Sequence, residues 1–216
     1  MGFPYAKIFK QALGLTQTNR FLWPYGLLLL SVVVYPWAKP GLIKAIKALT
    51  DKQGTDFAKS FKAGNFFAVR IALFAFFAAV FLWLVYLWSA LAFVPAFLFV
   101  ASLLELSHLF IVLHDLKAAD SLSSALGLWA KYWPVLIMLS ISLFFLSALF
   151  PAAAMIVFFR FYGNIGMAVV ALFFLVLASL PLIFTQACWV LAFQELVKPV
   201  KLEQDERAAV LPEVAS

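Results

Sequence analysis

Charged residues are what this sequence has least of. Asp, Glu, Lys and Arg make up 12% of its 216 residues, whereas a soluble domain usually has about 25%. The shortfall is uneven, because long uncharged runs alternate with short basic segments, and this alternation is typical of proteins that cross a membrane several times. The composition therefore excludes an ordinary soluble enzyme or binding domain.

Residues that bind metals or act as nucleophiles are also scarce. The single cysteine, Cys188, excludes an intramolecular disulfide and a cysteine-based metal cluster. The two histidines, His108 and His114, are six residues apart, a spacing that neither a zincin helix nor a histidine box uses. There is no glycine-rich phosphate loop and no paired-aspartate motif of the kind found in phospholipid-headgroup transferases. We therefore predict no catalytic residue, no metal site and no cofactor, with an enzyme acting on membrane lipids as an alternative.

Four apolar runs are long enough to cross a membrane as helices, which takes about 20 residues. They are residues 66–89, 90–113, 134–150 and 165–197. The first two are separated by almost no loop and predict a tight hairpin. The third extends to about residue 159 if Pro151 only kinks it, and the fourth is long enough to tilt and to bend near Pro181. The runs predict an all-α, polytopic helical membrane protein with four transmembrane helices.

A fifth apolar run, residues 21–38, is barely long enough to cross, at about 27 Å. It either spans the membrane or is re-entrant. A crossing leaves four of the 16 Lys and Arg residues outside, whereas a re-entrant segment leaves only Arg160 outside, which the positive-inside rule prefers. An apolar segment that does not cross is unusual, however, because backbone groups at that depth need hydrogen-bond partners. Both options stay open, and both place the C-terminus in the cytoplasm.

The basic segments have the periodicity of amphipathic helices that lie at the membrane interface. They are residues 5–18, residues 41–50, a short helix capped by Thr55, and a helix capped by Asp120 or Ser121. In the first, the predicted inner face is Ile8, Phe9, Ala12, Leu13 and Thr16; in the second it is Leu42, Ile46 and Leu49; in the third it is Phe57, Ala58 and Phe61.

The net charge of +6 indicates contact with anionic lipid headgroups rather than with nucleic acid, because basic loops are usual on the cytoplasmic side of membrane proteins. Most of this charge comes from residues 39–65. The predicted headgroup contacts are Lys44, Lys47, Lys59, Lys62 and Arg70. A membrane-protein partner is the other predicted interaction.

Two parts of the chain resemble each other. The sequence ALGL at 12–15 is followed by Trp23-Pro24 and an apolar run, and ALGL at 125–128 is followed by Trp133-Pro134 and another. The repeated unit would be a surface helix that leads into a membrane helix from the same side. The alternative is coincidence in a biased composition.

The candidate polar site inside the membrane is Glu105 with His108. They are spaced i, i+3 and share one helix face. Di-iron bundles use the same spacing, but they need a second such motif and further Glu residues that this chain lacks. Ionisable residues in a span are either structural or part of a path for protons or substrate. We favour the structural role, in which Glu105 pairs with His108 or with a neighbouring serine.

Beyond this site, His114 and Asp115 mark the cytoplasmic boundary, and Asp120 begins the next helix. We expect one membrane domain over residues 1–200 and a mobile cytoplasmic tail over 201–216, which is polar.

The segments HDLKAADSLSSALGLWAKYWPVLIMLSISL and CWVLAFQELVKP resemble the membrane domain attached to some bacterial glycerophosphodiester phosphodiesterases, and related small uncharacterised inner-membrane proteins. The resemblance is one of helix pattern over residues 8–200. The resemblance does not extend to the soluble barrel that carries out the hydrolysis in those enzymes, so we expect no catalytic residue to carry over. The resemblance implies a non-enzymatic protein of the bacterial cytoplasmic membrane that supports lipid handling or a membrane partner. The alternatives are a transporter or channel component that uses Glu105 and His108, and a lipid enzyme.

Overall fold

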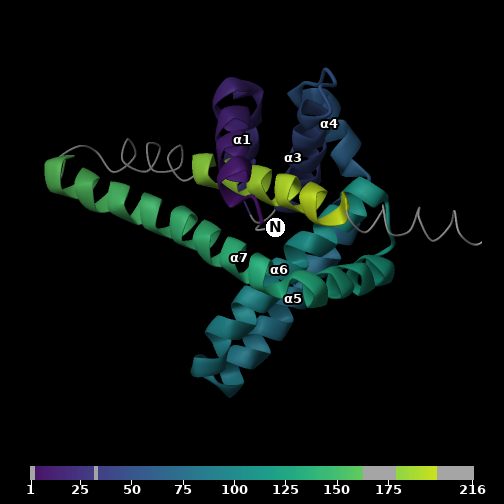
Figure 1. Cartoon of the computed structure of the whole chain (residues 1–216). Coiled ribbons are helices and arrows are strands. Elements are labelled where there is room, and N and C mark those ends of the chain that lie inside the picture. Colours follow the sequence, from purple (N-terminus) through teal and green to yellow (C-terminus); the bar gives the residue numbers. More distant parts are fainter. Residues whose placement is uncertain (1–2, 32–33, 163–178, 199–216) are drawn as a thin grey trace, which may run out of the picture.

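The computed structural model describes residues 3–31, 34–162 and 179–198, excepting the side chains of 90, 91 and 148–162, and these residues form helices without a strand (Figure 1). The helices are α1 (Tyr5–Thr18), the 3₁₀ turn η1 (Arg20–Leu22), α2 (Trp23–Leu29), α3 (Tyr35–Thr50), α4 (Phe57–Asn65), α5 (Ala68–Trp88), α6 (Ala90–His114), α7 (Ala118–Tyr162) and a final helix, Ser179–Lys198. Four of them contain stretches long and apolar enough to span a membrane: Ala68–Trp88, Ala92–His114, Ala118–Ser147 and Ser179–Lys198. The predicted all-α membrane protein is confirmed. The predicted tail, 201–216, lies outside the described residues.

The α5–α6 hairpin is as tight as the sequence predicts. Only Ser89 separates the two helices, and its extended backbone and hydroxyl cap α6 by accepting a hydrogen bond from the Ala92 N–H at 3.4 Å. The tip of the hairpin projects away from α1 and α4 (Figure 1). Around α5 the large apolar side chains are exposed, as with Phe77 at 66% and Trp88 at 90%. Such a surface is stable only in contact with lipid.

The sequence predicts a surface helix and a span on either side of Pro134, and α7 contains both. Its helical backbone is interrupted at Tyr132, where φ is −125° and ψ is 21°. The proline that follows two residues later lacks an N–H and disfavours helical geometry before it, which accounts for the break. The helix then continues through Pro151 to Tyr162, so the longer of the two predicted ends is correct.

One helix start differs from prediction. The helix expected to begin at Asp120 or Ser121 begins at Ala118, so Asp120 lies exposed in its first turn, where a carboxylate interacts favourably with the helix dipole. The predicted span 165–197 is described only over Ser179–Lys198, and Pro181, where a bend is predicted, lies near the start of that part. Residues 163–178 lie outside the described residues.

The N-terminal apolar run doubles back instead of crossing as one helix. α2 has seven residues, about 10 Å, far short of a bilayer. Tyr25 in α2 packs against Gly41 in α3, because a Cβ added to Gly41 would lie 2.9 Å from the Tyr25 ring. Since these positions flank the turn between α2 and α3, the segment is a helical hairpin and not a single spanning helix. This favours the re-entrant option of the two that the sequence left open.

α3 is a core helix, contrary to the prediction of an interfacial one. Leu42 and Ile46 are buried as expected, but Ile43 and Ala45 on its other sides are also fully buried. The reason is that α2, α4, α5 and α6 all pack around α3.

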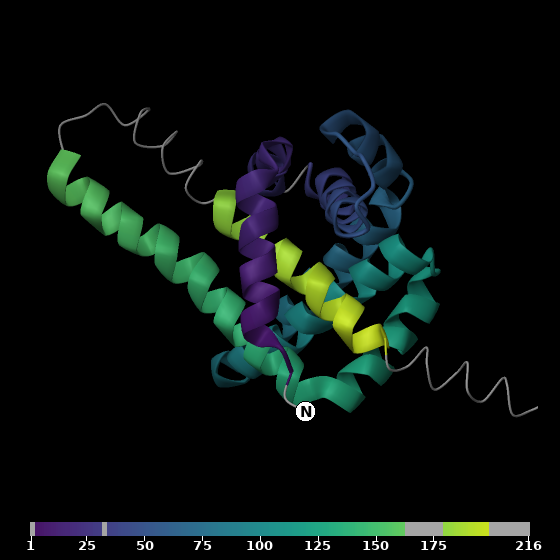
Figure 2. The same ribbon diagram turned by 45° about the horizontal axis from the view of Figure 1, so that its top comes forward.

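The final helix is similarly central, with Ala187, Cys188 and Val190 fully buried, and α1 crosses it (Figure 2). On α1, Ile8, Ala12 and Thr16 are buried as predicted, whereas Leu13 is 48% exposed.

The cap of α4 is Asp56 and not Thr55. An Asp56 carboxylate oxygen accepts a hydrogen bond from the Lys59 N–H at 2.8 Å. The buried face of α4 carries Ser60 and Gly64, while Ala58, predicted to face inward, is exposed. Phe57 and Phe61 are partly buried and stack on each other, and both rings lie near the Tyr25 ring.

Replacing Asp56 with alanine is expected to lower the free energy of unfolding by about 1 kcal/mol, because one N–H at the helix start loses its acceptor. Thermal unfolding of the detergent-solubilised protein measures this loss. Thr55→Ala is the matched control and should have little effect. A larger loss for Thr55→Ala than for Asp56→Ala would mean that the cap is assigned to the wrong residue.

Candidate functional site

The partner of Glu105 is a buried lysine. The Lys39 Nζ lies 2.6 Å from the Glu105 Oε1 and forms a salt bridge with it, and the two side chains are 2% and 21% exposed. The same amine donates a hydrogen bond of 2.6 Å to the Tyr35 hydroxyl, one turn earlier on α3. It also lies 5.1 Å from the centre of the Tyr35 ring. One ammonium group therefore lies between two side chains, the Glu105 carboxylate and the Tyr35 phenol.

The re-entrant hairpin brings Lys39 to this position. Lys39 lies about one helical turn after the start of α3 at Tyr35, and Glu105 lies ten residues before Asp115, or about 15 Å along α6. A charge at that depth is tolerated when an opposite charge with good hydrogen-bond geometry meets it. The pair explains how a glutamate is accommodated in the middle of an apolar helix, and it joins α3 to α6.

Sequence reasoning missed Lys39 because it was one lysine among many in the basic segment 39–65. A signal was available. Lys39 stands in the stretch VVVYPWAKPGLI, with no other charge in it, and Tyr35 precedes it at i−4 on the same helix face. These are the surroundings of a buried lysine rather than of one that contacts headgroups.

His108 is buried but does not pair with Glu105. Its ring is fully buried and lies edge-on to Phe74, with 6.4 Å between the ring centroids. Among the described residues, four buried side-chain atoms in this part of α6 have no hydrogen-bond partner. They are the Glu105 Oε2, the Ser107 Oγ and both ring nitrogens of His108. Buried polar atoms usually bind a protein group or an ordered water.

The predicted charged boundary is formed by an ion pair between α5 and the end of α6. The Arg70 Nη1 lies 2.9 Å from the Asp115 Oδ1 and donates to the Leu116 carbonyl at 3.2 Å. Asp115 ends α6 in the left-handed region, with φ of 52°. His114 and Asp115 are exposed, as expected at a boundary. Arg70 thus binds a protein carboxylate, where the sequence alone suggested a headgroup contact.

The other predicted headgroup contacts differ in their surroundings. Lys44 is half-buried, with its amine 5.1 Å from the centre of the Phe67 ring. Burial lowers the pKa of the Lys44 amine, and the nearby charge of Asp115 opposes that change. Lys47 pairs with Asp51 at 3.0 Å on the surface. Lys59 and Lys62 are exposed on α4, so these two are best placed to meet headgroups.

Together, the spanning helices and the internally paired charges define the class: a helical integral membrane protein. Among the described residues, no cluster of three or more His, Cys, Asp or Glu side chains could hold a metal ion. Comparison with protein-family models gives no match, and no curated protein or solved structure matches the chain either.

Proposed function

We propose that this is a non-enzymatic protein of the bacterial cytoplasmic membrane that supports lipid handling, with anionic phospholipids as its ligands and its C-terminus in the cytoplasm. One observation carries the proposal. Exposed lysines stand on α1 and α4, namely Lys7, Lys10, Lys59 and Lys62, while the tip of the α5–α6 hairpin lies on the far side (Figure 1).

The tip has a different chemistry. Trp83, Tyr86 and Trp88 are 60%, 57% and 90% exposed there, and aromatic residues of this kind settle at the membrane–water interface. The exposed lysines are on α1 and α4, and the exposed aromatic residues are at the tip of the α5–α6 hairpin. This arrangement supports insertion with the lysines at the cytoplasmic leaflet, where anionic lipids attract them.

A path for protons or substrate through Glu105 is the less favoured function. Lys39 already neutralises Glu105 at 2.6 Å, so the carboxylate has a structural role without any transported ligand. An enzyme acting on membrane lipids is the other alternative, and the sequence contains no catalytic motif that favours it. The resemblance to the membrane domain of glycerophosphodiester phosphodiesterases remains a prediction in line with this proposal.

The test uses the full chain, extracted from membranes that contain phosphatidylglycerol and phosphatidylcholine. Native mass spectrometry should find phosphatidylglycerol retained in preference to phosphatidylcholine, and the double variant Lys59→Gln/Lys62→Gln should weaken that preference. Incubation with phospholipids or glycerophosphodiesters should yield no product. Equal retention of both lipids by the wild-type protein, or protein-dependent hydrolysis, would overturn the proposal.

A further inference from the structure

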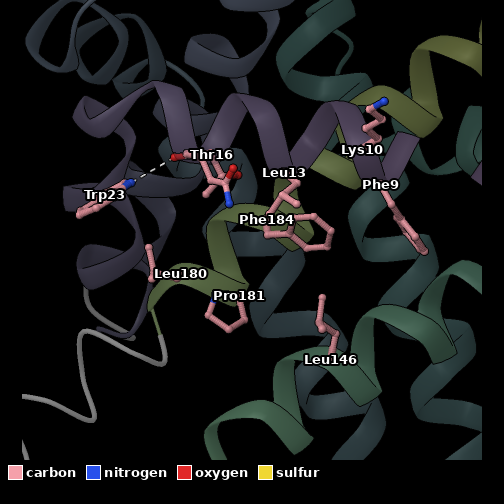
Figure 3. Close-up of a pocket in the computed structure, with 10 residues that line it drawn as sticks. Phe9, Lys10, Leu13, Thr16, Trp23, Leu146, Leu180, Pro181 and Phe184 are labelled. Atoms are coloured by element: carbon pink, nitrogen blue, oxygen red, sulfur yellow. Dashed lines mark hydrogen bonds between the residues drawn. The ribbon is translucent and has the colours of Figure 1, made fainter. Parts of the chain in front are cut away.

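A cavity of about 520 Å³ lies between α1, α7 and the final helix. This is within the range of ligand-binding pockets, which is roughly 300–1,000 Å³. Figure 3 shows Phe9 and Leu13 entering it from α1, Phe184 and Pro181 from the final helix, and Leu146 from α7. The lining is almost entirely apolar, so the cavity does not suit a polar solute.

One edge of the cavity is cationic. Lys10 contributes to the lining, and its amine points away from the cavity toward the outer side of α1 (Figure 3). No Asp or Glu contributes to the lining. The cavity therefore combines an apolar interior with a positive charge at its outer edge, which is the complement of an acyl chain that ends in an anionic headgroup.

A second cavity lies next to the second ALGL sequence, at 125–128. Leu122 and Leu126 of α7 line an apolar cavity of about 350 Å³ against α5 and α6. Leu122 lies three residues before the second ALGL sequence and Leu126 is its second residue. Phe9 and Leu13 have the same positions relative to the first. Each unit thus places an apolar pair at i, i+4 over a cavity.

Burial follows the repeat as well. Ala12 and Ala125 are both fully buried, and Leu13 and Leu126 are 48% and 42% exposed. The two units match at these positions, but the first leads into the seven-residue α2 and the second continues within the long helix α7. The second cavity has no charged residue in its lining, and it therefore serves as an internal control for the first.

We propose that the first cavity binds one acyl chain of an anionic phospholipid, with the phosphate near Lys10. The proposal rests on the proposed function and names the site within it. In a bilayer, an apolar cavity on a membrane protein is filled by lipid tails at no hydrophobic cost, and the cation at its edge then selects the headgroup.

The experiment uses the full chain in nanodiscs with phosphatidylglycerol that carries a photoreactive group on its acyl chain. Crosslinks are mapped by peptide mass spectrometry and should fall on the segments of α1 and the final helix that contain Leu13 and Phe184. Lys10→Gln should weaken phosphatidylglycerol binding about fivefold, as expected for one basic residue near a headgroup, without changing phosphatidylcholine binding. Leu13→Trp, at a half-exposed position that tolerates a larger ring, should abolish the crosslinks at this cavity.

Two matched variants make the outcome specific. Lys7→Gln removes an exposed charge one turn away that does not line the cavity, and Leu126→Trp fills the second cavity. Both should leave crosslinking at the first cavity unchanged. Equal effects of Lys7→Gln and Lys10→Gln, persistence of the crosslinks in Leu13→Trp, or capture of a protein helix at this position would overturn the site. If phosphatidylglycerol preference persists but maps elsewhere, the site fails while the proposed function stands.

Discussion

Replacing Lys39 with methionine is expected to lower the free energy of unfolding by about 3–5 kcal/mol, the usual loss when one partner of a buried ion pair is removed. Methionine fills a similar volume, so the loss comes from charge rather than from packing. The Glu105 carboxylate would remain on α6 without the amine that now lies 2.6 Å from it. Reversible unfolding of the variant in detergent, compared with the wild-type protein, measures the loss.

The double variant Lys39→Met/Glu105→Leu distinguishes the loss of the whole ion pair from the loss of one charge in it. When both charges of a buried pair are replaced by apolar groups, stability is often unchanged or higher, so the double variant should recover most of what Lys39→Met loses. Glu105→Leu alone should be as harmful as Lys39→Met, because it leaves the amine buried. A harmless Lys39→Met would show that Glu105 is neutralised in some other way, and the ion pair would lose its structural role.

This pair links the two least ordinary features of the chain, the re-entrant hairpin and the glutamate within a span. α2 has seven residues and packs closely, with Tyr25 fully buried against α3 and α4. The Lys39–Glu105 ion pair adds a direct bond from α3 to α6. It therefore connects the hairpin to the helix that carries the glutamate.

Long apolar runs made the spans predictable from the sequence. Residues 66–89 and 90–113 became α5 and α6 almost unchanged, because continuous hydrophobicity over about 20 residues has few other structural outcomes. The break before Pro134 was predictable for a similar reason, since a missing N–H acts locally. The cap of α4 was misplaced by one residue, because Thr55 and Asp56 are both good caps.

Contacts between distant residues could not be predicted in this way. Whether residues 21–38 cross depends on Tyr25 meeting Gly41, and the partner of Glu105 lies 66 residues away. Periodicity describes one helix at a time and does not say which helices meet. The basic segment 39–65 also concealed Lys39, since a count of charges treats every lysine alike.

The second large effect is expected at Gly64, where α4 approaches α3 most closely. A Cβ at this position would collide with the backbone N of Gly41 and lie 2.7 Å from its Cα. Backbone cannot rotate aside as a side chain can, so Gly64→Ala must push α4 away from α3. We expect a loss of about 3 kcal/mol, at the upper end for overpacking, measured as for Lys39→Met.

Gly14→Ala is the matched control, and it is expected to change the free energy of unfolding in the opposite direction. Gly14 is also inside a helix, but nothing lies within 4 Å of its Cβ position. Alanine there restricts only the unfolded chain and should stabilise the protein by about 0.5–1 kcal/mol. The same substitution should thus act in opposite directions on α4 and α1. If Gly64→Ala were also stabilising, α3 and α4 would not be in backbone contact at Gly41 and Gly64.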